Sequence, residues 1–408
     1  MKKLNIAIIG LGNIGSYLFK YLKDNKKILT EKNNCTPHVT FVSAKNKKKK
    51  RNIKIKKKQW LNNYLDATVH RDVDIIIELI GGAEGAAKKL VFNALKNKKH
   101  VVTANKALIA KYGDQLAKIA EKNQVNLEYE AAVCGGVPII RSLKEGLIAN
   151  KISKIYGIFN GTSNYILSSM DKQNKNFDEV LNNAKKLGYA ESNPSDDLNG
   201  NDVSSKLKIL SSLCFNTFLN HDIYVEGIKD IDKNDIDNAN KLGYKIKLLG
   251  YAELLNNKIN QRVHPTLIKK GSHIAGIDGV LNAVIVSGKP VGQSSIQGEG
   301  AGPSATTSAL VSDISSILRG NIKFPFSLSN KERKKLKSSN ISDKFFSAYL
   351  RFEVLDKPGV LSSITNIFSK NKVSIKRLIQ DPNKGKKSSS IIIITHSSKD
   401  IYLNKIVK

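Results

Sequence analysis

Two oppositely charged residues, four positions apart on one expected helix, could take part in proton transfer. Asp202 and Lys206 fall within the expected helix 199–214, so their side chains share one helix face. On an arbitrary helix such a pair is usually a surface ion pair. Here, however, carboxylates gather in an otherwise lysine-rich chain, at Glu191, Asp196, Asp197 and Asp202. Clustered carboxylates suit a substrate that carries an ammonium group, and a nearby lysine, with an ordinary pKa near ~10.4, can supply a proton.

The N-terminal sequence contains a glycine pattern that is typical of dinucleotide binding. Residues 4–9 predict a buried strand, and Gly10-Leu-Gly-Asn-Ile-Gly15 follows it directly, before helical spacing begins. Gly10 would permit the tight turn, Gly12 would let the backbone approach the pyrophosphate, and Gly15 would allow close helix packing. The pyrophosphate would then lie at the positive end of the helix. A turn that merely joins a strand to a helix is the alternative. The expected cofactor contacts are Gly10, Leu11, Gly12, Asn13, Ile14 and Gly15.

The end of the second expected strand favours NADP(H) over NAD(H). An acidic residue there would bind the ribose 2′-hydroxyl and repel a 2′-phosphate. This chain has Ser43-Ala44-Lys45 at that place, followed by further lysines. We therefore predict an NADP(H) preference to which Lys45 contributes. If the lysines are only a feature of surface composition, both cofactors are accepted.

The order of the expected elements predicts an α/β fold in several parts. Strands and helices of ten or more residues alternate up to residue 131, which favours a parallel, doubly wound Rossmann-type sheet. After Gly135-Gly-Val-Pro138 the period changes, and a mixed α+β pattern follows. Residues 347–395 predict strand, helix, strand and strand, the start of a ferredoxin-like module. The expected parts are residues 1–138 for cofactor binding, 139–320 for catalysis and dimerisation, a linker at 321–344, and 345–408 for the last module.

Composition argues for an ordinary globular protein. The formal net charge is +32, but nearly all the basic residues are lysines spread along the whole chain rather than arginines gathered for phosphate recognition. A nucleic-acid binder is therefore the weaker alternative, and we expect no nucleic-acid or membrane partner. No apolar run is long enough for a membrane helix. Three scattered cysteines provide neither a disulfide framework nor a zinc ribbon, so we expect a soluble, cytoplasmic protein.

Six segments, in order, give the chain a specific resemblance to a known family. They are Gly10–Gly15, Glu78-Leu-Ile-Gly-Gly82, Val101-Val-Thr-Ala-Asn-Lys106, Tyr129–Ile140, Gly157–Tyr165 and Leu187–Lys206. Together they resemble homoserine dehydrogenase, the monofunctional form with a C-terminal ACT domain, over nearly the whole length. The resemblance implies NAD(P)-dependent interconversion of L-aspartate 4-semialdehyde and L-homoserine, in threonine, methionine and isoleucine biosynthesis.

The same resemblance implies roles for individual residues. Lys206 would be the acid/base that protonates the alkoxide formed when hydride reaches the aldehyde carbon. Lys106 would contact both substrate and cofactor in the same site. Glu191, Asp197 and Asp202 would hold the substrate. Gly188 and Gly302 would contact the cofactor, and the helix 303–318 after Gly302 would return to pack on the first domain.

A monovalent-cation site is also implied by the resemblance. Sodium or a similar ion would be held by the Glu130 carboxylate and by the carbonyl oxygens of Val133, Gly135 and Val137. The alternative is a tight Gly-Gly-Val-Pro hinge between domains, and both can hold together. Cys134 lies within this segment, and because no basic partner is recognisable we interpret it as a packing residue.

The C-terminal module resembles an ACT domain, in which Asp356-Lys-Pro-Gly359 joins the first strand to the first helix. ACT domains bind amino acids at paired interfaces, so the resemblance implies threonine as a possible inhibitor and a homodimer or homotetramer. The chain ends at Lys408, in the expected second helix, so the module looks truncated and its role as an assembly surface remains open. A non-catalytic amino-acid sensor and a reductase of another carbonyl substrate are the further alternatives.

Overall fold

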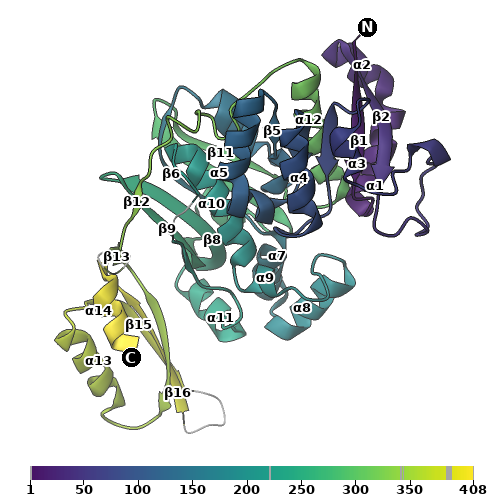
Figure 1. Cartoon of the computed structure of the whole chain (residues 1–408). Helices are drawn as coiled ribbons and strands as arrows, with labels where there is room; N and C mark the ends of the chain where they lie inside the picture. The colour runs from purple at the N-terminus through teal and green to yellow at the C-terminus, as the bar shows by residue number, and fades with distance from the viewer. Residues whose placement is uncertain (1, 220–221, 341, 343, 383–387, 408) are drawn as a thin grey trace.

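The computed structural model describes residues 2–219, 222–340, 342, 344–382 and 388–407. Two large sheets and a smaller C-terminal sheet organise the chain. In Figure 1 the C-terminal elements, coloured yellow-green to yellow, lie to one side of the two larger parts. Among the described helices, none is long and apolar enough to cross a membrane.

A parallel five-stranded sheet forms the N-terminal part, in the order β2-β1-β3-β4-β5. Ile6 and Ile8 of β1 pack on one side of this sheet with α1 and with the later helix α12, Pro303–Leu318. Ala7 and Ile9 pack on the other side with α4 and α5. Helices therefore cover both faces, and the predicted doubly wound α/β fold is confirmed. The bounds are β1 Lys2–Ile9, α1 Asn13–Asp24, α2 Lys26–Asn33, β2 Cys35–Ser43, α3 Asp66–Val69, β3 Ile75–Glu78, α4 Ala86–Lys96, β4 His100–Thr103, α5 Lys106–Asn123 and β5 Leu127–Glu128.

A mixed sheet forms the middle of the chain, in the order β11-β10-β6-β8-β9-β12, and β7 pairs with β9. Helix α10 packs on β6, β8 and β9 and also against α5 of the first sheet. It therefore lies where the two large parts meet. The bounds are α6 Ile139–Arg141, β6 Lys151–Ile158, α7 Gly161–Gln173, α8 Phe177–Lys186, α9 Ser195–Leu198, α10 Asn201–Phe215, β7 Tyr224–Val225, α11 Lys233–Lys241, β8 Tyr244–Leu255, β9 Lys258–Lys269, β10 Leu281–Lys289, β11 Gly292–Glu299 and β12 Lys337–Ser338.

Helix α12 (Pro303–Leu318) joins the middle of the chain to the N-terminal sheet. Leu310 and Ile314 of α12 share a buried cluster with Leu18 and Leu22 of α1. Proline at the first position suits a helix start, where its missing N–H is not needed. Figure 1 shows α12, in green, beside the purple N-terminal elements. At α12 the chain thus returns from the middle part to the N-terminal part.

Segment 321–344, which composition predicts to be a linker, is held to the larger parts at several points. Arg333 is buried and donates hydrogen bonds to the Ser212 hydroxyl at 2.8 Å and to the Thr217 carbonyl at 2.6 Å. It also forms an ion pair with Asp114 at 2.7 Å. Strand β12 adds to the edge of β9. Residues 341 and 343 of the segment lie outside the described residues.

The C-terminal part has the predicted β-α-β-β order. Its sheet runs β14-β16-β15 with antiparallel pairings. Ile364 and Phe368 of α13 and Ile391 and Ile393 of β16 form its buried core together with Leu403 of the last helix. The bounds are β13 Phe345–Phe346, β14 Tyr349–Leu355, α13 Val360–Lys370, β15 Ile375–Pro382, β16 Ser388–Thr395, β17 Ser398–Lys399 and α14 Asp400–Val407.

Candidate active site

One buried carboxylate joins two lysines from two different helices. Asp202, in the first turn of α10, lies 2.8 Å from the Lys206 ammonium through one oxygen and 2.8 Å from the Lys106 ammonium through the other. Lys206 is 8% exposed, whereas the Lys106 side chain, at the start of α5, is 42% exposed. The i,i+4 spacing therefore produced a buried pair rather than the surface pair of the alternative interpretation.

The charges in this pair stabilise each other. Burial favours the neutral form of Asp202, but the Lys206 and Lys106 ammonium groups outweigh burial and hold the pKa of Asp202 well below its usual range. Burial likewise disfavours the charged form of Lys206, but Asp202 opposes it, and the pKa of Lys206 is raised. Lys206 is therefore a protonated, buried ammonium at neutral pH, and it can donate a proton.

A backbone carbonyl completes the surroundings of Lys206. The Lys206 ammonium donates to the Phe159 carbonyl at 2.6 Å. The side-chain amide of Asn282, on β10, donates to the same oxygen at 3.1 Å. Phe159 follows β6, so the Lys206 ammonium is fixed against the mixed sheet. Neither contact was predicted, because every residue has a backbone carbonyl and the residue type does not show which carbonyl accepts a hydrogen bond.

Asn160 links the two carboxylates that were predicted to bind substrate. Its side-chain Nδ2 donates to Asp197 at 2.7 Å and to Asp202 at 2.9 Å. Its side-chain Oδ1 accepts the Ser163 N–H at 2.8 Å and so caps the N-terminus of α7. Burial and the neighbouring Asp202 raise the pKa of Asp197. Sequence reasoning missed Asn160, although an asparagine directly before a helix start was a usable signal.

Two other predicted residues lie on the segment between α8 and α9. Glu191 is exposed, and in the described part of the chain no hydrogen bond or ion pair joins it to Asp202 or Lys206. Gly188, two residues after the end of α8, has φ +76°, a conformation that favours glycine. The Thr162 hydroxyl donates to the Tyr189 carbonyl at 2.7 Å, which fixes this segment to α7.

The glycine turn between β1 and α1 has the geometry of an anion cradle. A Cβ on Gly10 would lie 2.3 Å from the Leu79 carbonyl oxygen, and one on Gly15 would lie 2.0 Å from the Gly10 carbonyl oxygen. A Cβ on Gly12 would meet open space. No side chain caps the N-terminus of α1, so the N–H groups at Asn13 and Ile14 face this space without a capping partner. The residues present therefore fit a bound pyrophosphate.

A positively charged side chain covers this turn. Arg51 donates from Nε to the Leu11 carbonyl at 2.9 Å, and its guanidinium lies 5.7 Å from the ring centre of Trp60. Lys45, the predicted determinant of cofactor preference, is exposed at the end of β2. Arg51 was missed, although it is the one arginine in the lysine run 45–58.

Glu78 shapes the neighbouring loop. This buried carboxylate, at the end of β3, accepts the N–H groups of Ile80 at 2.7 Å and Gly81 at 3.0 Å. Asn105 reaches the same loop by donating to the Gly82 carbonyl at 2.7 Å. Because Lys106 follows Asn105, these contacts fix the start of α5 beside the loop.

The segment predicted to hold a cation is buried and begins at the Glu130 carboxylate. Glu130 accepts the N–H groups of Ile140 at 2.8 Å and Arg141 at 2.7 Å, and burial raises its pKa to about 7. Cys134 and Gly135 both have positive φ, at +57° and +50°. A buried carboxylate and neighbouring backbone carbonyls are oxygen ligands of the type that suits a hard monovalent cation, since a positive charge would offset the burial of the anion.

The surroundings of Val137, Gly135 and Cys134 in that turn are also defined. The Val137 carbonyl already accepts the Ile139 N–H at 2.7 Å. A Cβ on Gly135 would lie 2.5 Å from the Gly300 carbonyl oxygen, so the Gly302 loop packs closely on this turn. Burial raises the pKa of the Cys134 thiol to about 11, in keeping with a packing role. Within the described residues, no group of three or more His, Cys, Asp or Glu side chains could hold a metal ion.

Comparison with known proteins gives a consistent result over the whole chain. Family models match for the homoserine dehydrogenase NAD-binding domain at residues 10–130, homoserine dehydrogenase at 138–315 and the ACT domain at 348–401. The homoserine dehydrogenase of Neisseria gonorrhoeae is 38% identical over 100% of this chain and 95% of its own, and that of Bacillus subtilis is 36% identical with the same coverage. The crystal structure of a homoserine dehydrogenase from Thiobacillus denitrificans matches 100% of this chain and 94% of its own, with a TM-score of 0.91 and 36% identity.

Proposed function

The chain belongs to the homoserine dehydrogenase family, and on that premise we propose how its residues divide the work of the reaction. The reaction is the interconversion of L-aspartate 4-semialdehyde and L-homoserine with a nicotinamide cofactor, a step in threonine and methionine biosynthesis. The observation that carries the proposal is the Asp202 carboxylate, which is bound by Lys206 and Lys106 at once.

Lys206 is the proposed acid/base residue. The bound nicotinamide supplies the hydride that reduces the aldehyde carbon. Lys206 gives its Nζ proton to the oxygen that becomes the hydroxyl group, and takes it back in the reverse direction. Asp202 and the Phe159 carbonyl keep the ammonium charged and oriented, which is supported by their distances of 2.8 Å and 2.6 Å. Lys106, more exposed at the domain junction, contacts substrate and cofactor.

The carboxylates Asp197, Asp202 and Glu191 bind the substrate in this proposal. Asp197 and Asp202 share the Asn160 amide and lie next to the proton donor, so together they suit the substrate's ammonium group. Glu191 is exposed on a neighbouring segment, and its part is to complete the site when substrate is present. Asn160 is a positioning residue, because it acts through the two aspartates.

The proposed cofactor is NADP(H), with NAD(H) accepted less well. The turn from Gly10 to Gly15 would bind the pyrophosphate at the N-terminus of α1, and Gly188 and Gly302 would contact the cofactor from the catalytic part. Arg51 and Lys45 place positive charge beside the turn, where a 2′-phosphate would lie, and no acidic side chain ends β2.

The remaining proposals concern the cation and the whole protein. Glu130 and the carbonyls of Val133, Gly135 and Val137 would hold sodium or another monovalent cation, which stabilises the junction between the domains. The proposed parts are residues 1–138, 139–320 with its helix 303–318 packed on the first, the linker 321–344 and 345–408. We also propose a cytoplasmic homodimer or homotetramer that threonine inhibits through the C-terminal domain.

An absorbance assay at 340 nm tests the reaction and the cofactor together. The purified chain is mixed with L-aspartate 4-semialdehyde and NADPH, and the assay is repeated with NADH and with other small aldehydes and keto acids. We expect fast oxidation of NADPH with the semialdehyde and slower oxidation of NADH. Faster turnover with NADH would refute the cofactor proposal, and faster turnover of a different carbonyl compound would refute the substrate.

A further inference from the structure

The side chain of Asn282, in β10, is completely buried beside the carbonyl that binds Lys206. Ala283 pairs with Ile158 in the antiparallel β6–β10 ladder, so Asn282 lies opposite Phe159, one residue after the end of β6. The Asn282 Nδ2 donates to the Phe159 carbonyl at 3.1 Å, and the Lys206 ammonium donates to the same oxygen at 2.6 Å. One backbone oxygen therefore joins Asn282 to the proposed proton donor.

The same amide contacts two other segments of the site. A Cβ on Gly300 would lie 2.4 Å from both the Nδ2 and the Oδ1 of Asn282, so the amide packs directly on the backbone of that glycine. Gly300 lies two residues before Gly302, the proposed cofactor contact. Burial raises the pKa of the Cys134 thiol, and Lys206 and then the Asn282 amide oppose that rise, which places both groups near the thiol. Asn282 therefore lies where the Gly300 loop, the turn at Cys134 and the carbonyl bound by Lys206 meet.

One atom of this amide is unpaired. In the described part of the chain, no hydrogen-bond donor reaches the buried Asn282 Oδ1. A buried polar atom without a partner destabilises the folded state, and such atoms are few in folded proteins. Leucine has the same branched shape without this atom, and the Phe159 carbonyl would keep its hydrogen bond from Lys206. Stability alone would therefore favour leucine here, so the amide is better explained by what its N–H donor does.

We propose that Asn282 is a positioning residue that orients the proton donor, an inference that rests on the function proposed above. A carbonyl oxygen has two lone pairs, and here one accepts from Asn282 and the other from Lys206. By fixing the Phe159 carbonyl, Asn282 fixes the direction in which the Lys206 ammonium points. Its packing on Gly300 holds this arrangement against the loop that would contact the cofactor.

The loss of this donor should affect the chemical step and not substrate binding. Without Asn282, the Phe159 carbonyl would keep one partner and could turn, and a displacement of ~1 Å in a reacting group can cost up to ~10²-fold in rate. Within the described residues, Asn282 forms no hydrogen bond with Asp197 or Asp202, the carboxylates proposed to bind substrate. The expected change is therefore in kcat, with the KM for substrate preserved.

Initial rates and thermal unfolding of Asn282→Leu, in the full chain, test the proposal. We expect kcat for NADPH oxidation with L-aspartate 4-semialdehyde to fall about 10-fold or more, while the KM for the semialdehyde stays within about 2-fold. The solvent deuterium isotope effect on kcat should increase, because a misplaced donor makes proton transfer slower. The melting temperature should equal or exceed that of wild type, because the unpaired oxygen is removed.

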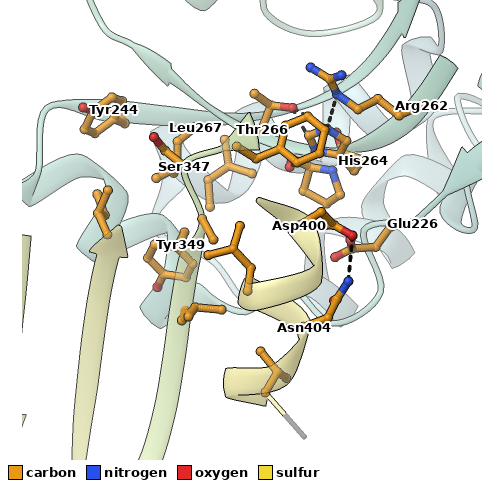
Figure 2. Close-up of a pocket in the computed structure, with 18 of the residues that line it drawn as sticks. Glu226, Tyr244, Arg262, His264, Thr266, Leu267, Ser347, Tyr349, Asp400 and Asn404 are labelled. Carbon is orange, nitrogen blue, oxygen red and sulfur yellow. Dashed lines mark hydrogen bonds between the residues drawn. The ribbon is translucent and has the colours of Figure 1, made fainter. Parts of the chain in front are cut away.

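Two other asparagines provide matched controls. Asn126 is buried and fully paired: its amide donates to the Asn321 carbonyl at 2.6 Å and accepts the Lys323 N–H at 3.0 Å. Asn126→Leu should lower the melting temperature and leave kcat within about 2-fold of wild type. Asn404 is exposed, and Figure 2 shows it hydrogen-bonded to Asp400 beside the cavity between β9 and the C-terminal domain. Asn404→Leu should change neither quantity.

Asn282→Ala keeps the test informative if Asn282→Leu fails to fold, because alanine lacks the donor and cannot collide with Gly300. Its kcat should also fall about 10-fold or more. A folded Asn282→Leu or Asn282→Ala variant with kcat within 2-fold of wild type would overturn the proposal. So would a fall in the melting temperature of Asn282→Leu as large as that of Asn126→Leu, with an unchanged isotope effect, since this would assign Asn282 a structural role. A wild-type chain without turnover would instead refute the proposed function.

Discussion

Asp202 neutralises two ammonium groups, one buried and one at the domain junction. Asp202→Asn would leave the Lys206 charge buried without its partner, and breaking such a pair costs about 3–5 kcal/mol. We expect a loss of about 3 kcal/mol in the free energy of unfolding, measured with urea at pH 7. Asn201→Ala, one residue earlier and exposed, is the control and should change stability by less than about 1 kcal/mol.

The pH dependence of that difference follows from the two pKa shifts. The lowered pKa of Asp202 gives stability that is complete above its unfolded pKa, near ~3.9, and is lost as the pH falls through the folded pKa. The raised pKa of Lys206 gives stability that is complete below ~10.4 and is lost as the pH rises through the folded pKa. The stability gap between wild type and Asp202→Asn should therefore be constant near neutrality and narrow as the pH falls below about 4. A gap that widens in acid would contradict the assigned charges.

Arg51 tests the cofactor proposal at the level of one side chain. Arg51→Ala should raise the KM for NADPH about 10-fold and change the KM for NADH much less, because only NADPH carries the 2′-phosphate. Lys54→Ala, an exposed lysine of the same run, is the control. Equal increases for both cofactors would mean that Arg51 supports the turn through the Leu11 carbonyl and does not select the cofactor.

At the level of elements, two substitutions in the β1–α1 turn distinguish an effect on folding from an effect on cofactor binding. Gly15→Ala would bring a Cβ against the Gly10 carbonyl at 2.0 Å, so we expect a lower melting temperature and lost activity. Gly12→Ala would place its methyl group in open space, so the melting temperature should stay within about 2 °C while the KM for NADPH rises at least ~10-fold. Thermal unfolding and initial rates distinguish the two. A normal KM in Gly12→Ala would place the pyrophosphate elsewhere.

The elements themselves were largely predictable because their signals are local. Apolar runs and a glycine turn predicted the first strand and helix, and the i,i+4 spacing brought Asp202 and Lys206 together on α10. The contacts that orient them were not predictable in this way. Asn160 and the Phe159 carbonyl come from another element about 40 residues earlier, and only the tertiary fold brings them to Asp202 and Lys206.

At the scale of the whole molecule, composition predicted the structure less well than local sequence patterns did. The segment 321–344 is polar and was predicted to be a linker, yet Arg333 within it is buried and bound to Asp114. Composition does not predict which arginine is buried, because the burial depends on partners from elsewhere in the chain. The predicted parallel, doubly wound sheet, in contrast, follows from the alternation of strands and helices, which is a property of the sequence pattern.

The attachment of the C-terminal domain depends on a small polar cluster. Arg351 forms ion pairs with Asp232 and Asp235, and the Tyr349 hydroxyl donates to Asp235 at 2.8 Å. Arg351→Ala should therefore loosen the domain and increase limited proteolysis between residues 321 and 344, with basal kcat within about 2-fold of wild type. Lys370→Ala, an exposed residue of α13, is the control. Unchanged proteolysis would show that apolar contacts alone hold the domain.

The central claim is that Lys206 donates the proton in the reduction of L-aspartate 4-semialdehyde. The most direct measurement compares kcat for NADPH oxidation in wild type, Lys206→Ala and Lys208→Ala, with folding checked by circular dichroism. Lys206→Ala should lose roughly 10²–10⁴-fold in kcat while the control, two residues along the same helix, stays near wild type. A folded Lys206→Ala variant that keeps near-normal kcat would contradict the claim and assign the proton to another group.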